Sequence, residues 1–153
     1  MTNRLSILLL TLLLCGGDSL AQCVLDPIHV AEIEGAVLFG YQGRYRLLEK
    51  AEVRLLDAAH VDQVIASASP DSDGHFVMPR LKPGKYILSA RSGGLIPASV
   101  DVEITRTGRG SPKRLILVIL SADATRECGG ASIKLQSKAE MDHFMAHAKT
   151  TFP

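Results

Sequence analysis

The chain contains no tryptophan, and aromatic residues make up only 5% of it, so few positions could form the flat platforms on which sugars stack. An excess of one charge is also missing, because 17 basic residues face 16 acidic ones and the net charge is +1. This balance excludes the one-sided basic surface of a nucleic-acid-binding protein. After the first 21 residues no long apolar run occurs, so no membrane span is expected in the mature form.

The first 21 residues follow the order of a cleavable secretory signal peptide. Arg4 supplies a positive start, Leu5–Leu14 form an apolar run, and Ser19-Leu20-Ala21 ends in small residues. The run is shorter than the roughly 20 apolar residues that span a bilayer. We therefore expect cleavage after residue 21 and a secreted or periplasmic protein. The alternatives are an uncleaved anchor and a lipoprotein modified at Cys23, although Gln22 fits poorly before a lipidated cysteine.

Three cysteines are present, and cleavage would remove Cys15 and leave Cys23 and Cys128. An even pair in an oxidising compartment favours a disulfide. Such a bond would close a loop of about 105 residues. In the chain-entropy model, a loop of this length stabilises the fold by up to about 4–5 kcal/mol. The alternative is a pair of free thiols.

Short runs of alternating apolar and polar residues, separated by turn residues, extend from about Val30 to Ser121. The clearest run covers residues 98–104, in which every second side chain is apolar. Pro70–Gly74 is a dense turn signal, and Gly40–Arg46 is expected to be a polar loop. Seven strands at this spacing predict an all-β, antiparallel sandwich.

Residues Leu115–Leu120 break the alternation, because both faces of this predicted strand are apolar and both should be covered. A candidate cover follows in the sequence. Ser137 and Glu140 form a capping box, and a helical stripe follows it, which predicts a helix from about Lys138 to Lys149. We expect the stripe to pack on the outer face of the apolar strand or to dock on a partner. Its members are Met141, Phe144, Met145 and Ala148.

Four short sequence motifs follow one another in the order found in a known domain family: Gly35–Val37, Ala51–Leu55, Asp71–Phe76 and Leu81–Leu88. Together they resemble the carboxypeptidase regulatory-like domain over about Glu32 to Ser121. The resemblance implies a seven-stranded Greek-key β-sandwich of prealbumin type, with an accessory role beside other proteins. We expect a signal peptide over residues 1–21, the sandwich with flanking disulfide segments over 22–136, and a short C-terminal α-helix and tail over 137–153.

Two histidine motifs could suggest a metal. His29 and Glu32 have the His-x-x-Glu spacing of the zinc ligands in metallocarboxypeptidases. The chain is far too short to hold that catalytic domain beside a sandwich. His143 and His147 lie one helical turn apart, a spacing that can hold a metal. No glutamate follows His143, and two ligands alone make a weak site, so a solvated polar edge is the alternative. We expect no cofactor and no metal.

The remaining exposed aromatics, Tyr41 and Tyr45, lie in one expected loop with Arg44 and Arg46, and this loop is a candidate contact surface. The helical stripe with Met141, Phe144 and Met145 is a second candidate. No catalytic set of residues can be assembled. The hypothesis is a non-enzymatic exported module that contacts another protein in the cell envelope or outside it, and the alternative is a module that binds a small ligand or carbohydrate.

Overall fold

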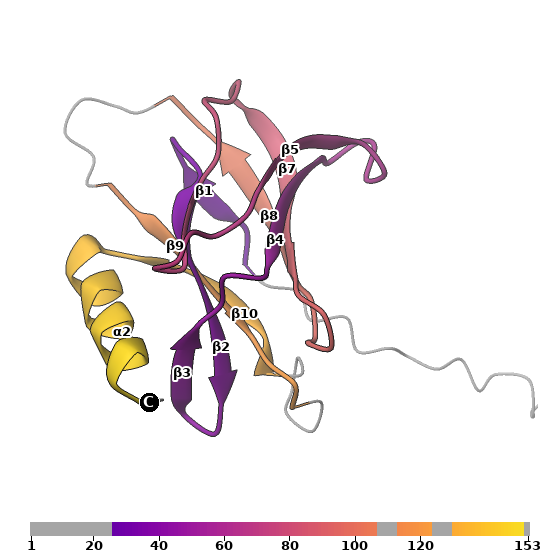
Figure 1. The fold of residues 1–153 in the computed structure, drawn as a ribbon. Helices are drawn as coiled ribbons and strands as arrows, with labels where there is room; N and C mark the ends of the chain where they lie inside the picture. Colours follow the sequence, from indigo (N-terminus) through magenta and orange to yellow (C-terminus); the bar gives the residue numbers. More distant parts are fainter. Residues whose placement is uncertain (1–25, 107–112, 124–129, 152–153) are drawn as a thin grey trace, which may run out of the picture.

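Ten β-strands and one α-helix make up the part of the chain that the computed structural model describes, residues 26–106, 113–123 and 130–151 (Figure 1). The helix, α2, covers Lys138–Thr151. The strands are β1 (Ile28–Val30), β2 (Glu34–Tyr41), β3 (Arg44–Leu47), β4 (Glu52–Asp57), β5 (Val64–Ala68), β6 (His75–Val77), β7 (Gly84–Arg91), β8 (Ala98–Ile104), β9 (Leu115–Leu120) and β10 (Ser132–Gln136). No helix in these residues has the length and hydropathy needed to cross a membrane.

The strands form two mixed sheets. Sheet A has the order β1-β8-β7-β4-β5, and sheet B has the order β10-β9-β2-β3, with β6 also paired to β2. Two neighbouring pairs are parallel, β1 with β8 and β2 with β9, and the others are antiparallel. The prediction of seven antiparallel strands was therefore wrong in number and in direction. Its pattern missed β3, which lies in the expected loop, and β1 and β10, which lie at or beyond the ends of the Val30–Ser121 region.

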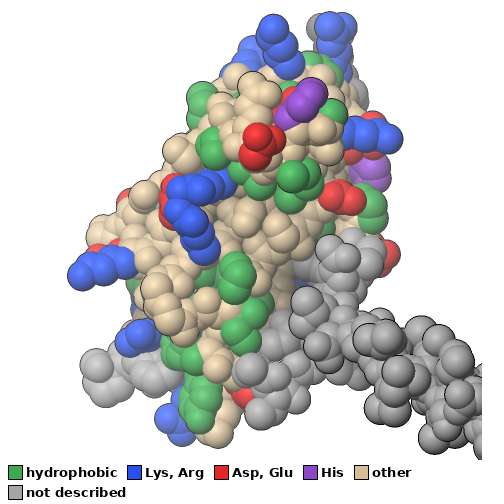
Figure 2. All heavy atoms as spheres, turned by 90° about the vertical axis from the view of Figure 1, so that its right-hand side faces the viewer, with side chains coloured by type: hydrophobic (Ala, Val, Ile, Leu, Met, Phe, Trp, Pro, Cys, Tyr) green, Lys and Arg blue, Asp and Glu red, His purple; other side chains and the backbone are tan. Residues whose placement is uncertain are grey.

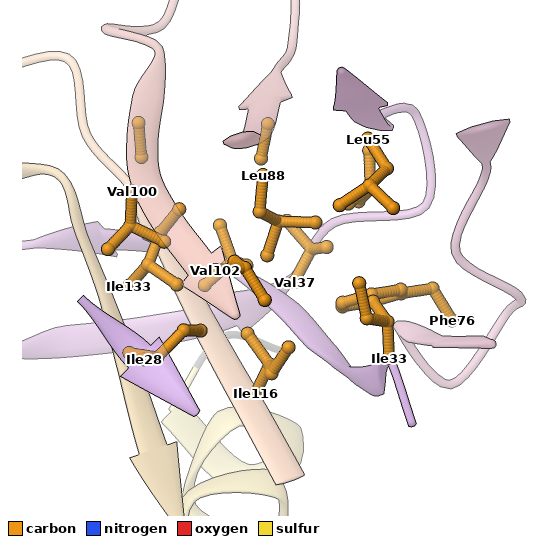
Figure 3. Close-up of a cluster of buried hydrophobic side chains, with 14 of the residues drawn as sticks. Ile28, Ile33, Val37, Leu55, Phe76, Leu88, Val100, Val102, Ile116 and Ile133 are labelled. Carbon is orange, nitrogen blue, oxygen red and sulfur yellow. The ribbon is translucent and has the colours of Figure 1, made fainter. Parts of the chain in front are cut away.

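The main core lies between the two sheets. Sheet A contributes the inward residues of β4, β7 and β8, and sheet B contributes those of β2, β9 and β10 (Figure 3). Strand β8 alternates between buried and exposed residues along most of its length, as its sequence predicts. Each fully buried Val, Leu, Ile or Phe side chain contributes about 1.5–3 kcal/mol relative to exposure. Members central to this core include Val37, Leu55, Phe76, Leu88, Val102 and Ile116.

A second, smaller core lies on the outer face of sheet B, where α2 covers β3 and β9 (Figure 1). Leu117 of β9 packs there with residues of β2 and α2, whereas Ile116 and Val118 face the main core. Both faces of β9 are therefore covered, which confirms the prediction from its two-sided apolar pattern. The order of layers in the molecule is sheet A, sheet B and helix.

The predicted start of the helix is also confirmed. The Ser137 N–H donates to Glu140 Oε2 at 2.7 Å, and the Glu140 N–H donates to Ser137 Oγ at 3.3 Å. These reciprocal bonds satisfy backbone donors that the first helical turn leaves without partners. They also hold the pKa of Glu140 below its usual value, chiefly through the backbone bond from Ser137. The helix continues to Thr151, two residues past the predicted end.

The residues expected to form a loop at Gly40–Arg46 instead form a tight hairpin. Strand β2 continues to Tyr41 and β3 begins at Arg44, so only Gln42 and Gly43 remain in the turn. Both have positive φ, 50° and 79°, the conformation of a type I′ turn, whose twist matches that of the flanking strands. Gln42-Gly43 is not the Asn-Gly or Asp-Gly pair that usually signals this turn, so the sequence predicted a longer loop here.

Candidate functional site

The β2–β3 hairpin gathers most of the expected contact residues and divides them between its two faces. Phe39 pairs with Arg46, and Tyr41 pairs with Arg44. Tyr45 pairs with Gly40, the residue between Phe39 and Tyr41, so its side chain points to the opposite face. Directly opposed residues share a face of a sheet, and residues two apart on one strand also share it. One face of the hairpin therefore carries two aromatic rings and two guanidinium groups.

These four residues, Phe39, Tyr41, Arg44 and Arg46, are called the hairpin face below. The rings of Phe39 and Tyr41 stack with centroids 6.5 Å apart and an interplanar angle of 6°. The guanidinium carbon of Arg46 lies 4.9 Å from the centroid of the Phe39 ring, within cation–π range. The contacts restrict the side chains before any partner binds.

The hairpin face is open to solvent and positively charged. Tyr41 is 45% exposed, both arginines are exposed, and Phe39 is half-buried. Within the described parts of the chain, neither Arg44 nor Arg46 forms an ion pair with a carboxylate. Two guanidinium groups with free donors beside two apolar rings can bind both a carboxylate and an apolar side chain.

Tyr45 lies on the opposite face of the hairpin and belongs to the packing of α2. Its ring meets Phe144 edge-on at 5.7 Å and His147 at 6.3 Å. The structure thus brings Tyr41 together with the two arginines and separates Tyr45 from them. Sequence reasoning did not include Phe39 in the contact surface, although its spacing of two residues from Tyr41 places the two on one face of the strand.

The second expected contact surface, the helical stripe, is enclosed by the protein itself. Met141 is 1% exposed and Met145 is 6% exposed, and both belong to the second core with Leu117. Phe144 is half-buried against the same core. Of the two alternatives for the stripe, the structure contains the first, packing on the outer face of sheet B. These side chains are therefore not available to a partner while α2 stays in place.

The histidines of α2 lie at the exposed edge of that core, where their rings meet Phe144 and Tyr45. His143 and His147 are exposed, and no group of three His, Cys, Asp or Glu residues that could hold a metal ion occurs in the described residues. His29 pairs instead with Glu103 across β1 and β8, with Nδ1 and Oε2 3.2 Å apart. Glu32, its partner in the zinc-like spacing, lies 3.8 Å from Lys113 Nζ.

Two ion-pair groups tie strands and turns together away from the hairpin face. Hydrogen bonds from Arg54 and Arg91 lower the pKa of Glu52 on the outer face of sheet A. Lys149 of α2 lies 2.6 Å from Asp73 in the turn before β6, and this bond lowers the pKa of Asp73. All of these groups are substantially exposed, so each pair contributes little to stability.

Two of the hollows in the described surface are small. A cavity of about 150 Å³ lies beside the hairpin, with Tyr41, Tyr45 and Lys134 in its lining. Another, of about 160 Å³, lies between Glu32 and Arg80. A third hollow of about 420 Å³, beside Glu52, is wide open to solvent. Pockets that enclose small ligands usually have 300–1,000 Å³ and bury most of the ligand, so neither of the two smaller cavities has that capacity.

No protein-family model matches the sequence, and no curated protein matches it either. The residues and their geometry are therefore the basis for a proposed function. Cys23, Cys128 and the predicted signal peptide lie outside the described residues, so the disulfide and export remain predictions.

Proposed function

We propose that this chain is an exported, non-enzymatic β-sandwich module that binds another protein in the cell envelope or outside it through the hairpin face. The observation that carries the proposal is the stacked Phe39–Tyr41 pair with Arg46 over the Phe39 ring. Tyrosine and arginine are enriched among the residues that dominate binding energy at protein interfaces. Because the contacts already restrict these side chains, binding loses less side-chain entropy.

The charge of the hairpin face indicates the chemistry of the partner. Arg44 and Arg46 are not neutralised by described carboxylates of this chain, so a partner with acidic side chains beside an apolar one would complement them. Figure 2, which shows the side on which β5 and β7 lie in Figure 1, has basic, acidic and hydrophobic side chains interspersed.

We also propose that the sandwich is of the carboxypeptidase regulatory-like, prealbumin type. The residues that carry the resemblance have the local roles that it implies. Gly74 has a φ of 76° in the turn before the buried Phe76. The Tyr86 hydroxyl donates to the Lys82 carbonyl at 2.9 Å across the turn that precedes β7, and Leu88 is fully buried. An accessory role beside other proteins agrees with binding through a surface hairpin.

Carbohydrate or small-ligand binding is the second candidate, and the exposed Tyr41 ring favours it, because aromatic rings serve as stacking platforms for sugars. The small volume of the neighbouring cavity favours protein binding instead. A protein partner needs an exposed patch rather than an enclosed pocket.

Site-specific photo-crosslinking in the native envelope tests the proposal. A photoreactive amino acid replaces Tyr41 in the full chain, and a matched protein carries it at Lys85, which is exposed on β7. We expect a discrete crosslinked protein from position 41 and none from position 85. The additional changes Arg44→Ala and Arg46→Ala should abolish that crosslink. The same crosslinked proteins from both positions would refute the proposal. No crosslinked protein from position 41, together with binding to a glycan array, would favour the second candidate.

A further inference from the structure

Strand β5 lies at the outer edge of sheet A and is hydrogen-bonded to β4 on one side. The backbone groups on the other side of an edge strand are open to a further strand. Proteins usually protect such edges with charged side chains, proline or bulges. A bulge at Ile65 is present here, between the pairs Leu55–Ala66 and Leu56–Val64, but Ala66–Ala68 keep a regular register with β4.

The composition of β5 distinguishes it from the other edge strands in the described residues. Its sequence is Val-Ile-Ala-Ser-Ala, without a charged or titratable side chain. Each of the other outer strands, β1, β3, β6 and β10, carries at least one: His29, Arg44 and Arg46, His75, and Lys134. Among the outer strands of the described residues, β5 is therefore the one without a titratable side chain.

The same edge concentrates exposed apolar side chains. Val61 is 59% exposed, Val64 46% and Ile65 39%, and these are three of the five large hydrophobic side chains that are exposed in the described residues. Val64 pairs with Leu56, which pairs in turn with Ile87, so an apolar row continues from the edge across three strands. Covering this edge would remove apolar surface from water.

We propose that β5 pairs antiparallel with β5 of a second copy of this chain, so that the two sheets A join into one continuous sheet across a two-fold axis. A strand that pairs with itself places its own side chains opposite one another, and like charges there are destabilising. Centred on Ala66, the pairing sets Ile65 opposite Ser67 and Val64 opposite Ala68 of the other copy. The same arrangement at β3 would bring arginines close to one another.

The expected dimer is weak. One pair of short strands and a few neighbouring side chains bury less surface than the 1,200–2,000 Å² typical of stable complexes. Sedimentation or light scattering should therefore cover about 10 µM to about 1 mM of the full mature chain. We expect the mass to rise with concentration from that of one chain toward that of two. Hydrogen exchange should slow over the same range at those amides of Ala66–Ala68 that point away from β4, because these amides gain partners.

Two double variants test the register. I65K/S67K places lysines along the edge of both copies and should keep the protein monomeric across the range. I65K/S67E places the introduced lysine opposite the introduced glutamate of the other copy, so association should be retained. Ser99→Lys, on the exposed face of the interior strand β8, is the control and should associate like the unmodified protein. Circular dichroism should show that each variant is folded.

Three results would overturn the proposal. The first is the mass of a single chain at every concentration, and the second is a dimer that I65K/S67K leaves intact. The third is equal loss of association in both double variants, because the two copies then do not pair in the proposed register. The exchange measurement uses only the unmodified protein, so it decides the question even if a variant fails to fold.

Discussion

Gly35→Ala gives a sharp test of the architecture, because Gly35 lies where β2 and β9 come closest. A Cβ atom at this position would lie 1.8 Å from the Ile116 carbonyl oxygen and 2.6 Å from its carbonyl carbon. The oxygen would have to retreat to at least 3.0 Å, the lower limit of real Cβ contacts. Both atoms belong to the backbone of the central parallel pair of sheet B, so no side-chain rotation can relieve the contact.

The cost follows from what must move. Separating Gly35 from Ile116 disrupts the first of the five residue pairs that join β2 to β9, and both strands line two cores. Overpacking a well-packed interior costs about 1–3 kcal/mol when side chains can adjust. Here we expect about 3 kcal/mol or more from a total stability of about 5–15 kcal/mol, which lowers the melting temperature by roughly 10 °C or more.

Gly93→Ala is the matched control, because no heavy atom lies within 4 Å of a Cβ built there and its φ is outside the left-handed region. That variant should keep the stability of the unmodified protein within about 0.5 kcal/mol. Thermal unfolding followed by circular dichroism compares the two. Melting temperatures of the two variants within about 2 °C of each other would refute the close approach of β2 and β9.

Three further predictions concern the helix and the cysteines. Met145→Asp should cost about 3 kcal/mol or more in urea unfolding, because it buries a carboxylate in the apolar second core, whereas the same change at an exposed helix position should cost under 1 kcal/mol. Lys149 lowers the pKa of Asp73 below 3.8, so their pairing stabilises the fold above about pH 4 and is lost as the pH falls through the lowered pKa. Lys149→Met should thus lower the melting temperature slightly at neutral pH and not in strong acid, and a carboxyl titration by NMR should show the pKa of Asp73 rising. Alkylation of the denatured mature chain should label Cys23 and Cys128 only after reduction, and labelling without reductant would exclude the disulfide.

The predictions that held are those in which local pattern and tertiary environment agree. The alternation at residues 98–104 corresponds to β8, one face of which is buried in the main core. The apolar run at Leu115–Leu120 required two covered faces, and sheet A and α2 provide them. The capping box at Ser137 fixed the start of α2, because the side chains that satisfy the first turn are encoded locally.

The failures occurred where pairing partners are distant in sequence. Ile28–Val30 is a strand because it lies parallel to Val102–Ile104, and a three-residue segment carries no periodic signal of that partner. The hairpin at Gln42 was taken for a loop because its turn lacks the usual residues. As a result, Tyr41 and Tyr45 were placed in one surface patch, whereas strand geometry sends them to opposite faces.

That division gives α2 a role in the proposed function without contact to a partner. The helix packs against Tyr45 and Leu47 on one face of the hairpin, and thereby supports the strand that carries Arg44 and Arg46 on the other. Deleting the helix would expose Leu38 and Leu117 to water and loosen β3, so loss of a partner on truncation would not locate the contact on α2. Single changes on the hairpin face leave the second core intact, and for that reason they separate binding from folding.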